Sequence, residues 1–426
     1  MAPIAAPDRI TPGVEDVIAD AKLHGNSGTG EHSMVLNMGP QHPSTHGVLR
    51  VVIELDGEIV VALAPDIGYL HTGIEKTCEA KFYQQVVPLT DRIDYLSPMT
   101  NNLAYCLAVE KLLGLEIPER AQLIRVLLNE LTRIESHLVW LGTHAMDIGA
   151  LTVFLYCWRE REAILRIFEA VSGQRMMTSY FRIGGLALEP PIGLFESIQT
   201  FLDDMPSKID QYEGLLTGNP IWMGRLKGVG HLSAADAIAL GVTGPPLRAS
   251  GVDWDLRRDM PYSGYEKFHF DVPTSTDGDV WARYTVRMLE MRESVKICQQ
   301  AMDMLAALPR GADGRPGPIV ADAPKIILPN REQMKTQMES LIHHFKIVTE
   351  GFAVPAGEVY QAVESPRGEM GYYVVSDGTA KPYRVHMRNP SFATLQALET
   401  MCKGRLIADV VAVIGSIDIV LGEIDR

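Results

Sequence analysis

The stretch NMGPQHPSTHGVLR, residues 37–50, places two histidines, His42 and His46, four positions apart among turn-forming residues. Pro43 follows His42 and Gly47 follows His46, and both residue types disfavour a regular helix. The two imidazoles therefore cannot share a helical face, and we expect a loop that presents them. Loops of this kind commonly carry binding residues when rigid elements hold both ends.

Predicted β-strands flank the histidine loop on both sides. Residues 34–38 precede it and residues 48–55 follow it. The dipeptide Asp56-Gly57 then separates the second strand from a third at residues 58–63, which is typical of a hairpin with a type I′ turn. The loop is therefore predicted to join two strands of one small sheet.

Two interpretations compete with a binding role for these histidines. A two-histidine metal site is the first, but the helical H-E-x-x-H arrangement does not fit a loop, and no third or fourth ligand follows at a recognisable spacing. The second is that one or both imidazoles only satisfy backbone groups of the loop by hydrogen bonding. The residues alone leave this second interpretation open.

The length and composition are those of a globular protein. The chain has 426 residues, of which 46% are hydrophobic and 22% are charged, so we expect one large core with small appended domains, or two domains. The net charge of −14 argues against nucleic acid as a partner, because phosphate backbones are bound by clustered lysine and arginine. No targeting peptide and no continuous apolar span are evident, which predicts a soluble or peripheral protein without a transmembrane segment.

The five cysteines occur singly, with no C-x-x-C pair among Cys78, Cys106, Cys157, Cys298 and Cys402. Disulfides, structural zinc and iron–sulfur ligation by this chain alone are therefore not expected. We predict that the chain binds no metal and no cofactor of its own.

The remaining pattern predicts an α+β fold in which a bundle of long helices lies between two β-units. Apolar residues recur every three or four positions after Pro118, from Ile124 to Leu141, which predicts a long buried helix. Further helices are predicted at residues 74–85, 101–113, 153–171, 194–216, 279–308, 331–349, 392–401 and 406–415, and strands at 358–363, 370–376 and 383–386. The domains expected are a flexible arm (1–32), an N-terminal β-unit carrying the histidine loop (33–90), the central bundle (91–350), and a small antiparallel sheet with helices and a buried tail (351–426).

Asp147 lies where the long helix should end before the next one begins. No lysine or arginine occurs between Ser136 and Trp158, so its counter-charge has to come from elsewhere in the chain. Burial without such a partner would raise the pKa of Asp147. Plain structural interpretations exist as well: Asp147 could be a helix cap, and Tyr95, near the entrance of the predicted helix at 101–113, a tyrosine at the rim of the core.

Motifs spread through nearly the whole chain after about residue 33 resemble the D-subunit family of bacterial NADH:quinone oxidoreductase, relatives of the 49 kDa subunit of mitochondrial complex I. The most specific is GPQHPSTHG at residues 39–47, and others are IGYLHTG at 67–73, DYL at 94–96, DIGALT at 147–152, RERE at 159–162 and YSGY at 262–265. The resemblance implies a hydrogenase large-subunit-like version of the α+β fold. It also implies that the chain is one component of a proton-pumping oxidoreductase and is not active alone.

The same family is similar to the large subunit of nickel–iron hydrogenases, which holds its metals with one early and one late C-x-x-C pair. The counterparts here lie near residues 92–97 and 418–426, and neither contains a cysteine. The resemblance implies that the old metal cavity persists without its ligands and admits a quinone head group. His42, Arg367 and Asp418 are implied to line that cavity.

Carried over by motif, His46 and Tyr95 are the residues implied to hydrogen-bond the quinone, and Asp147 is the carboxylate paired with His46. Two-electron reduction builds negative charge on the quinone oxygens, so a phenol and an imidazolium can donate hydrogen bonds first and protons afterwards. A carboxylate behind the histidine favours its charged form. We hypothesise that the loss of this charge on reduction helps to link the chemistry to proton pumping.

The resemblance implies partners as well as a substrate. Electrons would reach the quinone from an iron–sulfur cluster in a small neighbour resembling the B subunit of the same complex, and other neighbours would resemble its C, I and H subunits, the last of which is a membrane protein. The chain would lie peripherally on the cytoplasmic side of the inner membrane. The alternatives are the large subunit of a related membrane-bound hydrogenase or ferredoxin-linked complex, which the missing cysteine pairs disfavour, and a non-catalytic docking scaffold.

Two of the departures from the family pattern concern the terminal cluster and the tail. Met176-Met177 stands where many relatives have a histidine near the terminal iron–sulfur cluster, and methionine cannot take up a proton. This position is therefore not expected to make the potential of that cluster pH-dependent. Asp418-Ile419 stands where the family usually has Asp-Pro, so the turn of the tail is expected to form differently.

Overall fold

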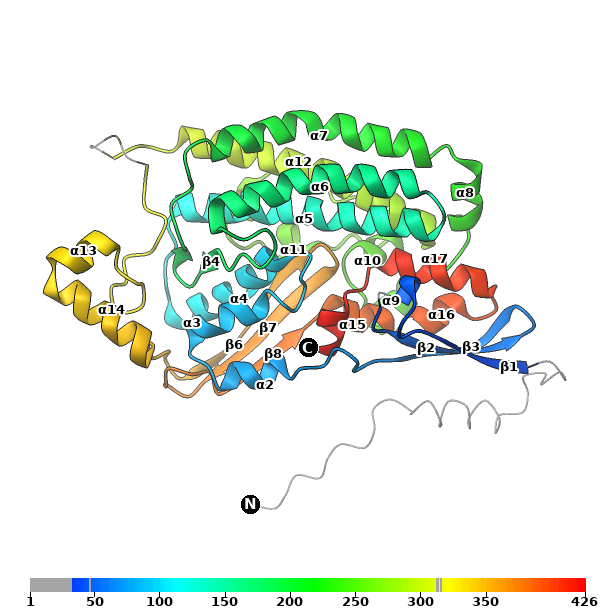
Figure 1. The fold of residues 1–426 in the computed structure, drawn as a ribbon, viewed down its shortest axis with the longest axis horizontal. Helices are drawn as coiled ribbons and strands as arrows, with labels where there is room; N and C mark the ends of the chain where they lie inside the picture. The colour runs from blue at the N-terminus through cyan, green and yellow to red at the C-terminus, as the bar shows by residue number, and fades with distance from the viewer. Residues whose placement is uncertain (1–32, 46, 312–313, 315) are drawn as a thin grey trace, which may run out of the picture.

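The computed structural model describes residues 33–45, 47–311, 314 and 316–426. Four long helices of this part stack into a bundle (Figure 1): α5 (Glu119–Asp147), α6 (Leu151–Ser172), α7 (Leu194–Leu216) and α12 (Val280–Ala307). The α5 helix packs against α6, α12, α17 (Ile407–Ile417) and α4 (Pro98–Leu113). Because it is covered on several sides, its residues 123–142 are buried, polar ones included.

The histidine loop joins the first two strands of a three-stranded antiparallel sheet, as predicted. The strands are β1 (Ser33–Met38), β2 (Arg50–Asp56) and β3 (Ile59–Asp66), in that order. Gly57 has φ +62° in the turn between β2 and β3, a conformation that glycine adopts without steric cost. The loop contains one short 3-10 turn, η1 (Pro43–Thr45), which packs against α17. The predicted arm at residues 1–32 and the predicted site residue His46 lie outside the described residues.

The second β-unit is an antiparallel sheet of β6 (Gly357–Ser365), β7 (Gly368–Ser376) and β8 (Arg384–Arg388). It packs against α4 beneath the bundle (Figure 1). Pro366 and Arg367 form the two-residue turn between β6 and β7. One hydrophobic core runs from the N-terminal sheet through the bundle to α18 (Leu421–Asp425). The α+β prediction, with a helical bundle between two small sheets, is confirmed.

Three predicted helices are each divided in two, so those predictions are wrong in their extent. Residues 74–85 belong to α2 (Ile74–Glu79) and α3 (Tyr83–Thr90), because Phe82 is extended and its N–H donates to the Gln85 side chain at 3.2 Å. This capping pattern starts a new helix, and Pro88 lies inside it. The others are α13 (Arg331–Thr336) with α14 (Met338–Glu350), and α15 (Pro390–Leu395) with α16 (Leu398–Cys402).

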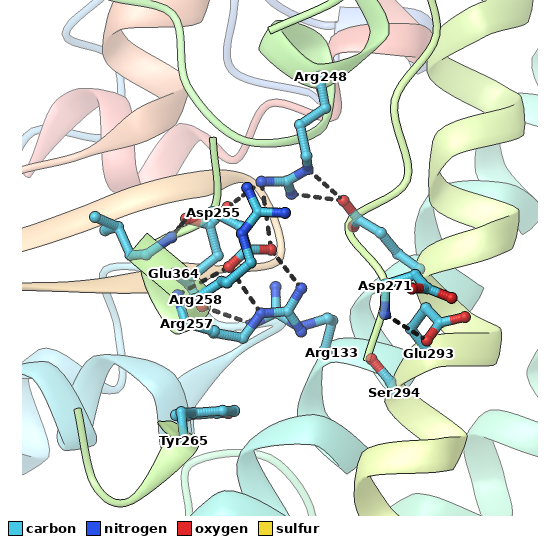
Figure 2. Close-up of polar contacts among 12 residues, drawn as sticks. Arg133, Arg248, Asp255, Arg257, Arg258, Tyr265, Asp271, Glu293, Ser294 and Glu364 are labelled. Atoms are coloured by element: carbon cyan, nitrogen blue, oxygen red, sulfur yellow. Dashed lines mark hydrogen bonds and ion pairs between the residues drawn. The ribbon is translucent and has the colours of Figure 1, made fainter. Parts of the chain in front are cut away.

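Buried ions connect the bundle to the second sheet (Figure 2). Arg257 on α11 (Leu256–Asp259) lies 2.7 Å from Asp255. It also lies 3.1 Å from Glu130 of α5. Arg248 on α10 (Pro245–Ala249) lies 2.5 Å from Glu290 of α12. Burying an isolated ion is costly, so each of these groups requires its partner. The pairs therefore fix how α5, α10, α11 and α12 lie relative to one another.

The C-terminal tail closes over two loops near the predicted site. The carboxylate of Asp425 accepts hydrogen bonds from the N–H groups of Gly68 at 2.8 Å and Leu70 at 2.7 Å. Gly422 lies directly against the Arg92-Ile93 backbone, and a Cβ there would be 2.5 Å from the Ile93 carbonyl oxygen. Only glycine allows this approach. The tail is thereby held at a fixed position beside the segment that carries Tyr95.

We predict that Glu130→Gln lowers the free energy of unfolding by about 3–5 kcal/mol at neutral pH, because it leaves the buried Arg133 without its paired carboxylate and removes one of the two carboxylates at Arg257. Burial alone would raise the pKa of Glu130, but Arg133, Arg257 and hydrogen bonds from Tyr265 and Ser294 lower it to about 2. The stabilisation is therefore present above the ordinary carboxyl pKa and lost as the pH falls towards 2. Denaturant unfolding at pH 7 and pH 3 measures both effects.

The matched control for this experiment is Glu358→Gln, an exposed glutamate of β6. It should stay within about 0.5 kcal/mol of the original protein. A Glu130→Gln variant as stable as this control would contradict a structural role for the ion pairs.

We predict that Asp425→Ala releases the 67–71 loop, because the amides of Gly68 and Leu70 lose their acceptor. Hydrogen–deuterium exchange should then be faster in peptides covering residues 67–71 and unchanged in peptides from β7. Equal exchange at 67–71 in both proteins would show that the carboxylate does not hold this loop.

Candidate functional site

Tyr95 is displayed by a tight turn between α3 and α4. The Asp94 carboxylate accepts a hydrogen bond from the Leu96 N–H at 3.0 Å and another from the Ser97 hydroxyl. These local bonds hold the turn closed in front of α4. Asp94 is completely buried, whereas the neighbouring Tyr95 is half-buried. A phenol therefore lies at the surface of a buried polar cluster.

Arg367 joins three segments that are far apart in the sequence. Its Nη1 donates to Asp94 Oδ2 at 2.5 Å, its Nε to the Asp418 carbonyl at 2.9 Å, and its Nη2 to Asp418 Oδ1 at 3.3 Å. Asp418 ends α17 with φ +50°, in the left-handed region, where aspartate is tolerated better than most residues. The structure thus brings together Arg367, Asp418 and the turn of Tyr95.

The charges around Arg367 affect proton binding near Tyr95. Burial raises the pKa of Tyr95, the Asp94 charge raises it further, and the Arg367 charge opposes both. Burial, with the Asp94 charge adding to it, raises the pKa of Glu423 to about 8. A raised pKa favours the protonated, neutral form of this carboxyl group, which lies close to the charged Asp94 and Arg367.

Sequence reasoning missed Asp94 and Glu423 as members of this cluster. Asp94 belongs to the DYL motif, in which only the neighbouring Tyr95 was assigned a role. Glu423 lies in the short helix α18, where Leu421 and Ile424 are apolar, and an acid next to buried apolar residues was the available signal. Its carboxyl group accepts a hydrogen bond from the Ser391 N–H at 3.2 Å, a partner that the sequence does not reveal.

Asp147 and His42 form a second group. Asp147 is the last residue of α5 and is half-buried, and burial raises its pKa to about 6, against the opposing charge of His42. His42 Nδ1 also accepts from the Ser44 N–H at 3.2 Å, so this exposed histidine shapes its own loop. The α6 helix begins at Leu151 without a side-chain cap, so Asp147 does not cap it.

The two groups are linked by helices and not by direct contacts. Within the described residues, no hydrogen bond or ion pair joins Asp147 to Tyr95 or Arg367. Trp140, two turns before Asp147 on α5, donates to the Gly415 carbonyl of α17 at 2.8 Å, and α17 leads directly into Asp418. The same helix packs against the 3-10 turn of the histidine loop.

A groove of about 860 Å³ lies elsewhere, between α6 and α7, and is lined by residues such as Ala163, Ile167, Phe201 and Met205. None of the predicted site residues lines it.

Among the residues that the structure describes, no cluster of three or more histidine, cysteine or acidic side chains is arranged to hold a metal ion. In the same part of the chain, no helix has the length and apolar character needed to cross a bilayer.

Comparisons with known proteins agree on one family. The family described as respiratory-chain NADH dehydrogenase, 49 kDa subunit, matches residues 147–426. The chain is 72% identical to the second D-type subunit of NADH-quinone oxidoreductase from Koribacter versatilis over 396 residues, which are 93% of this chain and 96% of the relative. It is 67% identical to the first D-type subunit of Solibacter usitatus (94% and 96% covered) and 60% identical to the D-type subunit of Geotalea uraniireducens (92% and 98% covered).

The resemblance found in the motifs therefore extends over nearly the full length of these relatives. Identity of this level over more than nine-tenths of both chains leaves one assignment. The chain belongs to the D-subunit family of NADH-quinone oxidoreductase, the 49 kDa subunit family of respiratory complex I.

Proposed function

We propose that this chain binds the quinone head group in the peripheral arm of a proton-pumping NADH-quinone oxidoreductase and donates protons to it. The observation that carries the proposal is the position of Tyr95, a half-buried phenol beside the buried cluster of Arg367, Asp94 and Asp418. Such a cluster holds a proton donor in a fixed place next to a positive charge, which favours a reaction that builds negative charge on oxygen.

Tyr95 is the first proton donor of the proposed reaction. Its phenol donates a hydrogen bond to one carbonyl oxygen of the quinone and gives up its proton as two electrons arrive. Burial and the Asp94 charge raise the pKa of Tyr95, which keeps the phenol protonated until the electrons arrive, and the Arg367 charge limits this rise. Arg367 and Asp418 line the cavity and hold the turn of Tyr95.

His46 is the second donor, with Asp147 as its carboxylate partner and His42 beside them. A carboxyl group with a pKa near 6 is mostly ionised at neutral pH, and it then favours a protonated imidazole. Once His46 has donated its proton, Asp147 loses its counter-charge. We propose that the resulting movement of the glycine- and proline-bounded loop contributes to proton pumping.

The electrons come from an iron–sulfur cluster in a partner resembling the B subunit of the complex, and neighbours resembling its C, I and H subunits complete the surroundings. The protein lies peripherally on the cytoplasmic side of the inner membrane. Two observations support these partners, one for a protein interface and one for a cluster held by another chain. The α14 helix exposes an apolar stripe of Met338, Leu341, Ile342, Phe345 and Val348, which is typical of a protein interface. The five cysteines are buried and widely separated in sequence, so a cluster has to be supplied by another chain.

We predict that Tyr95→Phe lowers kcat for quinone reduction by about 10²–10⁴-fold, because the phenylalanine can donate neither a hydrogen bond nor a proton. Steady-state rates of the assembled complex with quinones of different tail length measure this. Electron transfer from NADH to a hydrophilic artificial acceptor should stay unchanged. Tyr383→Phe, at an exposed tyrosine before β8, is the matched control. Unchanged turnover of Tyr95→Phe with every quinone would remove Tyr95 from the chemistry and favour the docking-scaffold alternative.

We predict that Asp147→Asn removes a pH inflection near 6 from the quinone reduction rate and lowers the rate at pH 7 by at least about tenfold. In the original protein, burial raises the pKa of Asp147 to about 6. Above that pH its carboxylate supports the imidazolium, and this support is lost as the pH falls through 6. Asparagine is neutral at every pH. Rate profiles from pH 5 to pH 8, with proton pumping measured alongside, provide the test, with exposed Asp377→Asn as control. Full reduction and full pumping in Asp147→Asn would contradict the proposed link.

A further inference from the structure

Glu364, the penultimate residue of β6, has hydrogen bonds from four segments of the protein. Its carboxylate accepts from Arg248 Nη1 at 2.7 Å and from the Leu256 N–H at 3.3 Å. Its backbone N–H donates to the Tyr262 hydroxyl at 3.1 Å, and its carbonyl accepts from Arg133 Nη2 at 2.6 Å. The backbone and side chain of this buried residue are therefore both fixed.

Arg248, which binds Glu364, is itself held by the helical bundle (Figure 2). Its Nε and Nη2 donate to Glu290 Oε1 at 2.9 and 2.5 Å, and its Nη1 also donates to the Trp254 carbonyl at 3.0 Å. Glu290 Oε2 in turn lies 2.9 Å from His137 Nε2. Through Arg248, the end of β6 is connected to α12 and α5, two of the long helices.

Arg367 lies in the turn that follows Glu364, and its side chain extends to Asp94 and Asp418. The turn has little room to deform. Gly368 has φ +137°, and a Cβ there would lie 2.6 Å from the Thr243 hydroxyl. A Cβ on Gly244 would lie 2.4 Å from the Gly368 Cα. Because the turn is packed this closely, a shift of Glu364 moves Arg367 as well.

We infer that Glu364, held by Arg248, is a positioning residue for quinone reduction. It fixes the β6–β7 turn so that Arg367 can donate to Asp94, and this contact holds Tyr95 in place. This inference rests on the proposed role of Tyr95 and adds a residue that does not itself touch the substrate. The order of contacts runs from Arg248 to Glu364, through the turn to Arg367, and from Arg367 to Asp94.

The charge balance of the cluster indicates which substitution keeps the anchor. In the described part of the chain, the four carboxylates of Glu130, Asp255, Glu290 and Glu364 meet the three arginines Arg133, Arg248 and Arg257. Burial raises the pKa of Glu364, and the charge of Arg248 opposes that rise. Both oxygens of Glu364 accept hydrogen bonds, so glutamine keeps an acceptor for Arg248 but loses the acceptor for the Leu256 N–H, whereas alanine removes the anchor.

The test uses the assembled complex carrying Glu364→Ala, Glu364→Gln or the control Glu358→Ala, with decylubiquinone as substrate. We expect Glu364→Ala to lower kcat/KM for the quinone by about 100-fold, the size of effect that a small misplacement of a reacting group produces. Glu364→Gln should recover part of this loss, because it keeps the acceptor for Arg248, and Glu358→Ala should match the original protein. Electron transfer from NADH to a hydrophilic acceptor should be equal in all of them.

A double-mutant cycle separates positioning from a general loss of structure. If Glu364 acts through Arg367, adding Glu364→Ala to Arg367→Lys should lower kcat/KM by less than about threefold, because the two changes remove the same constraint. Fully multiplicative effects would overturn the inference. A kcat/KM for Glu364→Ala within about twofold of the original, while Tyr95→Phe remains impaired, would overturn it and leave the proposed function standing. An unimpaired Tyr95→Phe would instead contradict the proposed function.

Glu364→Asp covers the case in which the alanine variant does not assemble. The shorter side chain keeps the carboxylate but draws it back from Arg248 by one methylene. We expect kcat/KM to fall about tenfold, with an unfolding temperature close to that of the original complex. A Glu364→Asp variant with unchanged kcat/KM would count against the inference in the same way as an active alanine variant.

Discussion

One guanidinium holds together the part of the molecule on which the candidate site depends. Arg367 bonds Asp94 in the turn before α4 and Asp418 at the end of α17, so it connects segments that are more than 300 residues apart in sequence. Only 2% of Arg367 is exposed, and a buried charge of this kind requires its partners. Removing Arg367 takes this partner away from both Asp94 and Asp418, whereas removing either carboxylate leaves Arg367 with only one of its two. The position of Tyr95 follows from this constraint.

The two buried ion clusters share a single short turn. Glu364 belongs to the cluster between the long helices, and Arg367 belongs to the cluster at the tail. Replacing buried ion pairs by apolar residues is often neutral for stability, so such pairs are better understood as fixing geometry. In this chain they set the orientation of a β-turn relative to the bundle. The orientation of this turn fixes Arg367, and Arg367 in turn fixes the segment that carries Tyr95.

The sequence predicted those features that depend on local pattern. The apolar repeat predicted α5 close to its observed bounds, and Asp56-Gly57 predicted the hairpin. The division of three predicted helices was missed, because a short capping interaction such as the Phe82–Gln85 contact does not interrupt the spacing of apolar residues from which helices were predicted. The motif resemblance supplied Arg367, Asp418 and Tyr95. Glu364, Arg248 and Glu423 could not be found in this way, because their partners come from distant segments and only the folded chain brings them together.

The spread of the buried ions along the chain has a consequence for how the molecule folds. Glu290 and Glu364 share Arg248 as their partner, which lies 42 and 116 residues away along the chain, so neither segment can neutralise its own carboxylate. A partly folded intermediate that buries one of them early pays the full desolvation cost without compensation. The barrier to folding therefore lies late, at the docking of distant segments, and chains with this arrangement are expected to fold slowly and with high cooperativity.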